Sequence, residues 1–199
     1  MTEFEQDVQR MVKDVEHLIS RKLPVAAGKI AKQHFQDNFR QGGFVNGGLH
    51  PWTPAKRLSS GGRGADSHYP TLLSSRKHLF SSIGYTPGSA KVTIFNDVIY
   101  ASVHNEGGTV TVPVTAKMRR FAWAKYYALG GGGKGPQEGQ KGPKNANPEE
   151  AGKWKGLALT RKQSLTINIP RRQFMGESAE LTEKVAEYLE KELLKIVNK

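Results

Sequence analysis

Six histidines are the side chains of this sequence best suited to binding a metal ion or moving protons. They stand at positions 17, 34, 50, 68, 78 and 104. Histidine ligands on one helix or strand need a spacing such as HExxH or HxH, which places two ligands on one face. The sequence contains neither motif, and His34 lies on the apolar side of an expected helix, where a hydrogen-bonded core histidine is expected. We therefore predict no metal site and no cofactor.

A glycine-rich segment at residues 130–135, Gly-Gly-Gly-Gly-Lys-Gly, has a composition similar to that of a phosphate-binding loop. In such a loop a Ser or Thr follows the lysine and a buried strand precedes the glycines. Here Gly135 follows Lys134, and the preceding residues do not form a buried strand. The sequence has no GxSxG nucleophile motif, and the absence of cysteine excludes a thiol nucleophile, a disulfide or Cys-ligated zinc. We predict that the protein is not an enzyme.

Charge is distributed very unevenly along the chain. The 199 residues include 30 Lys and Arg against 18 Asp and Glu, a net charge of +12. Residues 40–80 hold 6 basic and 1 acidic residue, and residues 111–172 hold 13 basic and 3 acidic residues. Aromatic residues are interleaved with these charges: Trp52, Phe121, Trp123, Tyr126, Tyr127 and Trp154.

These basic, aromatic-bearing stretches have three interpretations. They could bind nucleic acid by neutralising phosphates and stacking on bases. They could be docking arms that become ordered on an acidic neighbouring subunit. They could also be solvated loops that only increase solubility. Composition favours docking arms without excluding the other two.

The start of the chain, Met1 to Glu5, is acidic where a secretory signal would be basic. No apolar run approaches the ~18 residues that a membrane span requires. The sequence therefore predicts a protein with no membrane partner, synthesised and assembled in the cytoplasm of the cell that makes it.

Helical periodicity is clearest at the two ends of the chain. Apolar residues recur at steps of three and four over residues 4–19, which predicts a surface helix packed on a core. Pro24 suits a first helical turn, so residues 24–39 are expected to form a second helix or a kinked continuation. Residues 177–197 predict a terminal helix, and residues 116–129 a short aromatic one.

Alternating β-branched residues predict strands in the middle of the chain. Residues 83–86, 91–95 and 98–103 are expected to form a three-stranded antiparallel meander, preceded by a short helix within residues 71–83. Residues 165–169 supply a fourth strand. Residues 109–114 also alternate, but Pro113 cannot donate to a ladder, so this piece is assigned to an edge or an extended arm.

The expected fold is α+β, with an antiparallel sheet of about four strands flanked by N-terminal and C-terminal helices. We predict a single domain over residues 1–199 that carries two long, Gly-rich, basic excursions, at residues 40–70 and 109–162. Trp52 is the expected anchor of the first excursion. Residues 130–155 have no apolar period and are expected to be disordered in the free protein.

Four motifs occur in a recognisable order along the chain. They are HFxxNFRQGGF at residues 34–44 with Trp52 downstream, Ser-Ser-Ile at 81–83, YAxVHNEGG at 100–108 and IPRRQFMG at 169–176, with KMRRF at 117–121 between the last two. Together they resemble the phage virion morphogenesis family, the tail-completion proteins of Mu-like phages. The motifs span nearly the whole chain.

The resemblance implies a non-enzymatic structural protein of the virion, located in the tail or neck. It implies a ring-forming subunit, sixfold like the tail tubes of the family, that completes the tail and helps join it to the head. Its partners would be other copies of itself, the tail tube and the head–tail connector, with non-specific contact to DNA passing through the ring. The alternative is a cytoplasmic nucleic-acid-binding protein that uses the basic loops.

Two groups of residues are assigned to the site on this basis. The first is a partner or subunit interface, in which arginines make charged contacts and aromatic residues are apolar anchors: Trp52, Arg119, Arg120, Phe121, Trp123, Arg171 and Arg172. The second is a structural turn after the third expected strand, in which glycines adopt positive φ and polar side chains bond the turning backbone: His104, Asn105, Gly107 and Gly108.

Overall fold

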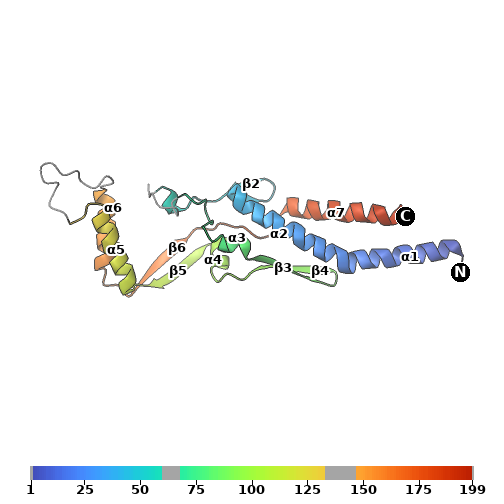
Figure 1. Ribbon diagram of the computed structural model, residues 1–199, viewed down its shortest axis with the longest axis horizontal. Helices are drawn as coiled ribbons and strands as arrows, with labels where there is room; N and C mark the ends of the chain where they lie inside the picture. The colour runs from blue at the N-terminus through green and yellow to red at the C-terminus, as the bar shows by residue number, and fades with distance from the viewer. Residues whose placement is uncertain (1, 60–67, 133–146, 199) are drawn as a thin grey trace. The chain divides into compact units, whose positions relative to one another are not determined.

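The computed structural model describes residues 2–59, 68–132 and 147–198. These residues form two compact units. The first unit contains the chain up to Gly108 together with the segment from Ile169 onward, and the second contains Thr109–Asn168 (Figure 1). The prediction of a single domain over 1–199 with excursions at 40–70 and 109–162 stays a prediction.

A long helical segment forms the N-terminal part of the first unit. Helix α1, Glu3–His17, leads through the π-helical turn η1, Leu18–Lys22, into α2, Leu23–Gln41. Thr2 forms a capping box with Glu5 at the start of α1. Gly42, at a φ of 69°, ends α2 in the left-handed conformation. The two predicted helices are thus one nearly continuous segment, and Pro24 is tolerated in the first turn of α2.

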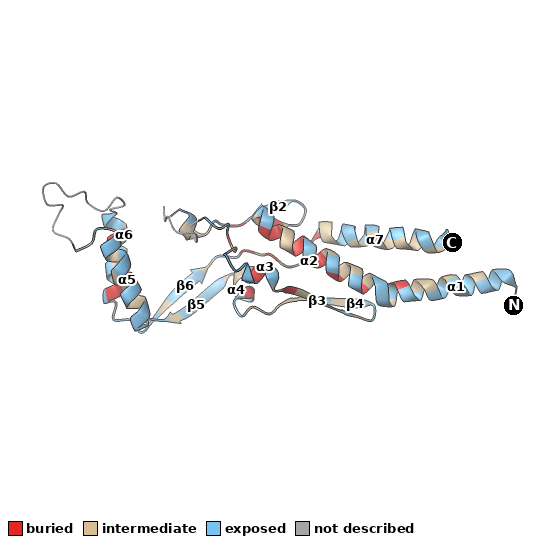
Figure 2. Cartoon of the chain, viewed as in Figure 1, coloured by how far each residue is buried: buried red, intermediate tan, exposed pale blue. Residues whose placement is uncertain are grey.

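The hydrophobic core of the first unit lies against α2 (Figure 2). Phe39 is fully buried, and its ring contacts the rings of Trp52, Phe80 and Phe174 at centroid distances of 5.4, 6.0 and 5.1 Å. Several separate segments of the chain meet there, contributing Ala31, Phe35, Phe39, Phe44, Trp52, Leu79, Ile83, Ala101 and Phe174. This core therefore depends on contacts between residues far apart in the sequence.

The strands form separate pairs, so the predicted single sheet of about four strands is wrong. Among the described residues, β1 (Gly43–Val45) pairs antiparallel with β2 (Leu49–Pro51), and β3 (Ile83–Gly88) pairs antiparallel with β4 (Lys91–Asn96). The third pair is β5 (Gly108–Pro113) with β6 (Ser164–Ile169). The mixed helix-and-sheet class and the hairpin over residues 83–96 are as predicted, but the strand at 164–169 joins β5 instead of that hairpin.

Residues 98–103, predicted as the third strand, instead lead into helix α4, Ala101–Glu106. Asn96 turns the chain, because its side chain accepts a hydrogen bond from the Val98 amide and donates one to the Leu79 carbonyl. The Ala101 amide then donates to the Val98 carbonyl. Side-chain hydrogen bonds of this kind compete with the backbone hydrogen bonds of a strand ladder. Here they favour the turn, so these residues do not form a strand despite their β-branched pattern.

Three further elements complete the first unit. The 3₁₀ turn η2, Lys56–Leu58, lies in the predicted excursion 40–70, which also contains β1 and β2. Helix α3, His78–Ser81, lies immediately before β3, as predicted for the end of residues 71–83. Helix α7, Ala179–Val197, starts at the N-cap Ser178 and confirms the predicted terminal helix.

The second unit contains two helices and one strand pair among its described residues. Helix α5, Ala116–Ala128, is the predicted aromatic helix, and α6, Pro148–Leu159, packs against it. The predicted disorder is therefore wrong for residues 148–155, where Asn147 caps α6 and Pro148 occupies its first turn. The buried residues of this helix pair are alanines: Ala122 on α5, and Ala151 and Ala158 on α6. Residues 133–146, which hold most of the rest of that prediction, lie outside the described residues.

Candidate functional site

Three segments meet at what we call the chain crossing: residues 52–54, 104–107 and 171–175 of the first unit. The Trp52 indole Nε1 donates to the Gln173 carbonyl at 2.6 Å. The Arg172 amide donates to the His104 carbonyl at 2.8 Å, and the Arg172 Nε donates to the Thr53 carbonyl at 2.8 Å. The structure thus brings together residues assigned to the site from three separate motifs.

Two asparagines fix residues 174 and 175 at the chain crossing. The Asn105 Oδ1 accepts hydrogen bonds from the amides of Phe174 and Met175, at 2.9 and 3.0 Å. Asn38, which is fully buried, donates from Nδ2 to the Phe174 carbonyl and accepts from the Val45 amide. Asn105 therefore bonds the backbone of a distant segment, and not the backbone of its own turn as predicted.

Gly107 and Gly108 both have positive φ, 74° and 142°. They follow helix α4 and not a strand, but the predicted need for positive φ holds. A Cβ added at Gly107 would lie 2.8 Å from the Arg171 backbone nitrogen. Glycine is therefore required at this position by its backbone conformation and by the close approach of the neighbouring segment.

Arg172 and Trp52, both assigned to a partner interface, lie in the interior of the first unit. Arg172 is 8% exposed and Trp52 is 7% exposed. Burial, and then the nearby Arg57, lower the pKa of Arg172. The Arg57 guanidinium itself donates to the carbonyls of Tyr69, Pro70 and Leu73. Arg171 by contrast is exposed, and its guanidinium donates to the Gln173 side chain.

The first unit contains two histidines whose pKa is lowered. Burial is the main cause for both His34 and His104, and the positive charges of Lys184 and Arg172, respectively, act in the same direction. The His34 Nε2 and the His104 Nδ1 are buried and have no hydrogen-bond partner among the residues that the structure describes. The hydrogen-bonded core histidine expected at position 34 is therefore buried as expected, but its Nε2 is unbonded.

Because the pKa of both histidines is lowered, we predict that the protein loses stability in mild acid. Each has a folded-state pKa below its unfolded value near 6.5, so below that pH the unfolded chain binds more protons, and stability falls as the pH drops. We expect a lower free energy of unfolding at about pH 5.5 than at about pH 7.5 in denaturant titrations. The double variant His34→Gln, His104→Gln should show a smaller difference between the two pH values. An equal difference in both proteins would contradict this account.

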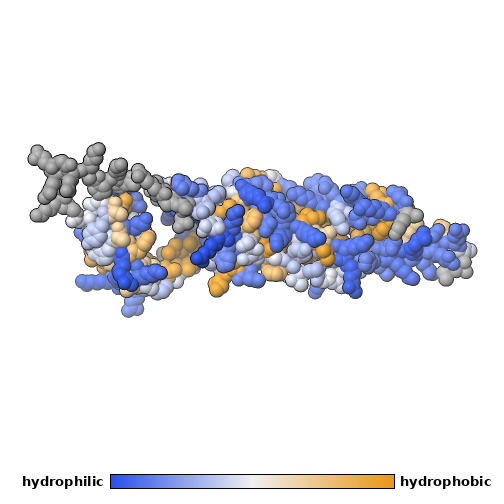
Figure 3. Space-filling model, viewed as in Figure 1, coloured by the Kyte–Doolittle hydropathy of each residue, from blue (hydrophilic) through white to orange (hydrophobic). Residues whose placement is uncertain are grey.

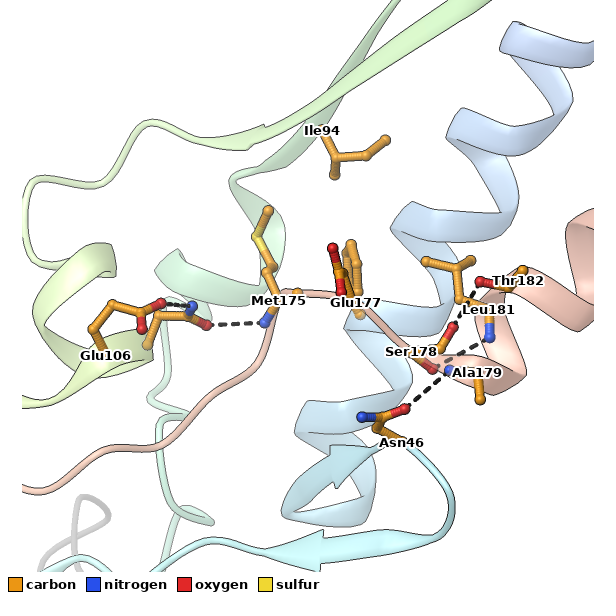
Figure 4. Close-up of a pocket in the computed structure, with 12 residues that line it drawn as sticks. Asn46, Ile94, Glu106, Met175, Glu177, Ser178, Ala179, Leu181 and Thr182 are labelled. Carbon is orange, nitrogen blue, oxygen red and sulfur yellow. Dashed lines mark hydrogen bonds between the residues drawn. The ribbon is translucent and has the colours of Figure 1, made fainter.

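An open groove of about 920 Å³ lies beside the chain crossing (Figure 4). Phe35, Ile94, Met175 and Leu181 give it an apolar part. The carboxylates of Glu106 and Glu177 and the capping residues of α7 also line it. Asn46 accepts a hydrogen bond from the Ala179 amide, and Ser178 accepts one from the Leu181 amide, so the start of α7 is already capped. The groove can accept an apolar side chain flanked by a cation.

The remaining site residues lie in the second unit. The Arg119 guanidinium donates to the Thr160 carbonyl and so links α5 to the end of α6. Arg120 is exposed, Phe121 is 53% exposed and contacts the Trp154 ring edge-on at 5.6 Å, and Trp123 stacks on Tyr127 at 5.8 Å. Arg120 and Phe121 are thus both exposed on α5, whereas Arg119 has an intramolecular partner. Their assignment to an interface stays a prediction.

The prediction that the helix over residues 4–19 packs on a core is wrong for most of its length. Leu18, in η1, is buried, but α1 itself has no buried residue. Phe4, Val8 and Val12 are 76%, 42% and 52% exposed. The amphipathic period identified these residues correctly, but it could not show that the described residues of the first unit leave them exposed. Figure 3 shows other apolar residues exposed among the hydrophilic ones on the face in view.

The described residues contain neither a cluster of metal ligands nor a membrane-spanning helix. Within residues 2–59, 68–132 and 147–198, no group of three or more His, Cys, Asp or Glu side chains could hold a metal ion. In the same residues no helix has the length and apolar content needed to cross a bilayer.

Comparison with known families places this chain in a class of proteins, those with a structural or assembly role in phage particles. The model of the phage virion morphogenesis family matches residues 3–194, nearly the whole chain. The chain therefore belongs to the phage virion morphogenesis family. Comparisons with curated proteins and with solved structures give no significant match.

Proposed function

We propose that this protein completes the phage tail and helps join it to the head, as one subunit of a closed ring at the tail terminus or neck. The observation that carries the proposal is the family match over residues 3–194. The restriction to Mu-like phages, the sixfold symmetry and the lack of any catalytic activity are parts of the same proposal. The proposed partners are further copies of the chain, the tail tube and the head–tail connector.

The surfaces of the two units support a role in assembly. The first unit leaves the apolar side chains of α1 exposed, and the second displays exposed arginine and aromatic residues on α5. Exposed apolar and aromatic side chains of this kind are typical of surfaces that bind other proteins. A subunit whose contacts lie on two separate units can bridge neighbouring components of a particle.

Removing the gene from a producing phage or prophage tests this function. We expect lysates to contain filled heads and tails of normal tube structure that remain unjoined, with a loss of infectious particles that a plasmid copy restores. Electron microscopy of the lysate distinguishes this result from its alternatives. Intact virions, or particles lacking heads or tails altogether, would contradict the proposal.

A nucleic-acid-binding function is the second candidate, favoured by the basic character of the second unit. Its described residues hold eight Lys and Arg against two Glu, counted over 109–132 and 147–168. A protein that works by binding DNA should lose affinity steeply with salt, in proportion to the number of phosphates contacted. A ring subunit should show only weak, non-specific binding to the DNA that passes through it, which a salt titration measures.

A further inference from the structure

Helix α1 presents an apolar stripe that the first unit leaves largely uncovered. Phe4, Val8, Met11 and Val12 recur at steps of three and four, and three of them are more than 40% exposed. The capping box at Thr2 and Glu5 fixes the start of the helix. The stripe therefore belongs to a well-formed helix and is available to a partner.

The C-terminal part of α1 lies near the end of α7. Asp14 and His17 of α1 line a small pocket together with Leu18 of η1 and with Glu192 and Ile196 of α7. The N-terminal part of α1 extends past the end of α7 (Figure 1). The stripe from Phe4 to Val12 thus has no apolar cover among the described residues of the first unit.

The charge of α1 points to a basic partner. The helix holds five acidic residues against two basic ones, Arg10 and Lys13, for a net charge of −3. The described part of the second unit has the opposite sign, with eight basic and two acidic residues. Opposite charges of this size favour encounter and orientation of two surfaces. A second copy of the chain therefore supplies a complementary partner for α1.

Helix α5 offers a matching face in that second unit. Arg120, Phe121, Ala124, Tyr127 and Ala128 are all exposed and recur at helical spacing. Phe121 and Tyr127 are 53% and 58% exposed. The alanines allow another helix to approach closely, the rings provide apolar contact, and Arg120 can meet the acidic residues that border the α1 stripe.

We propose that the apolar stripe of α1 packs against the exposed face of α5 in a second copy of this chain. The inference deepens the proposed function, on which it rests, by naming the contact between ring subunits. Such a contact joins two different surfaces, so each copy offers a free α1 to one neighbour and a free α5 to the next. Contacts of this type generate a closed ring or an open filament.

Association in solution provides the first test. Molar mass measured by light scattering over a concentration series should rise for the wild-type chain. Val8→Glu places a carboxylate in the stripe and should weaken association at least about tenfold. Gln6→Glu adds the same charge on the opposite side of α1, at an exposed position, and should associate like the wild type. Equal association of Val8→Glu and the wild type would overturn the proposal.

Cross-linking identifies the contact directly, because the chain has no cysteine of its own. A Val8→Cys chain mixed with an Ala124→Cys chain should form a disulfide between the two, whereas Gln6→Cys mixed with Ala124→Cys should not. If oligomers form without the 8–124 cross-link, the proposed contact between α1 and α5 is contradicted, but the proposed ring is not. A wild-type chain that stays monomeric and gives no cross-link would also overturn it.

Two other occupants of the α5 face are outcomes of the same experiments. A single chain that carries both Val8→Cys and Ala124→Cys provides a further test. If it forms only an internal disulfide and keeps the monomer mass, α1 docks on α5 of its own chain and the proposal fails. If Arg120→Glu abolishes DNA binding but leaves association unchanged, the face binds nucleic acid and the proposal also fails. The gene-removal experiment tests tail completion separately, since unjoined heads and tails would still appear whichever surfaces form the contact.

Discussion

Replacing Phe39 by alanine is expected to lower the free energy of unfolding by about 3–5 kcal/mol, the range for truncating a buried aromatic residue. Phe39 is fully buried, and its ring contacts Trp52, Phe80 and Phe174, which come from three distant parts of the chain. The cavity left by the ring would loosen all three segments together. Denaturant unfolding followed by tryptophan fluorescence measures the effect, because Trp52 is in direct contact with Phe39.

Phe4→Ala is the matched control for Phe39→Ala. Phe4 is 76% exposed on α1, so the same truncation removes little buried surface. We expect a change of less than about 0.5 kcal/mol in stability. If Phe39→Ala were as mild as Phe4→Ala, the cluster around Phe39 would not be the core of the first unit.

Helices and their ends were the features most fully predictable from the sequence. The stripes of α2 and α7, the position of Pro24 in a first turn and the stop at Gly42 all follow from local residue preferences. Residues 148–155 were missed because α6 has little amphipathic period and contains two glycines. Its stability comes from the Asn147 cap and from packing on α5, and the latter cannot be read from a local window.

Strand pairing was less predictable than strand location. Residues 164–169 form a strand as predicted, but its alternation of apolar and polar residues does not encode which strand it joins. The predicted meander ends at Asn96, whose two side-chain hydrogen bonds turn the chain toward α4. One bond goes to the Leu79 carbonyl, 17 residues earlier in the sequence, so it depends on the tertiary fold.

Burial of the candidate site residues was the least predictable property. Arg171 and Arg172 are adjacent and of the same type, yet the first is exposed and the second is buried. What separates them is that the Arg172 guanidinium reaches the carbonyls of Thr53 and Pro54, which compensate for its loss of water. These acceptors are 119 and 118 residues away in the sequence. No local pattern around Arg172 could have identified such distant partners.

Gly107→Ala is expected to destabilise the protein by about 3–5 kcal/mol, combining backbone strain with overpacking. Gly107 has a φ of 74° and a ψ of 178°, a conformation that is essentially restricted to glycine. The new Cβ would also lie 2.8 Å from the Arg171 nitrogen, which belongs to the backbone and cannot rotate away. The adjacent amide of Arg172 bonds the His104 carbonyl, so displacement of this segment disturbs the chain crossing.

Gly42→Ala measures the cost of a positive φ without a close contact. Gly42 has a φ of 69°, close to that of Gly107, but a ψ of 27°, and no atom of the described residues lies within 4 Å of an added Cβ. The Gly42→Ala substitution should therefore lower the free energy of unfolding only by the strain of the left-handed conformation, about 1–2 kcal/mol. Denaturant titration of the two variants gives both values. Equal losses would show that neither the contact with Arg171 nor the ψ of 178° adds to the cost of a positive φ. A larger loss for Gly107→Ala means that these two features, and not a positive φ alone, require glycine after α4.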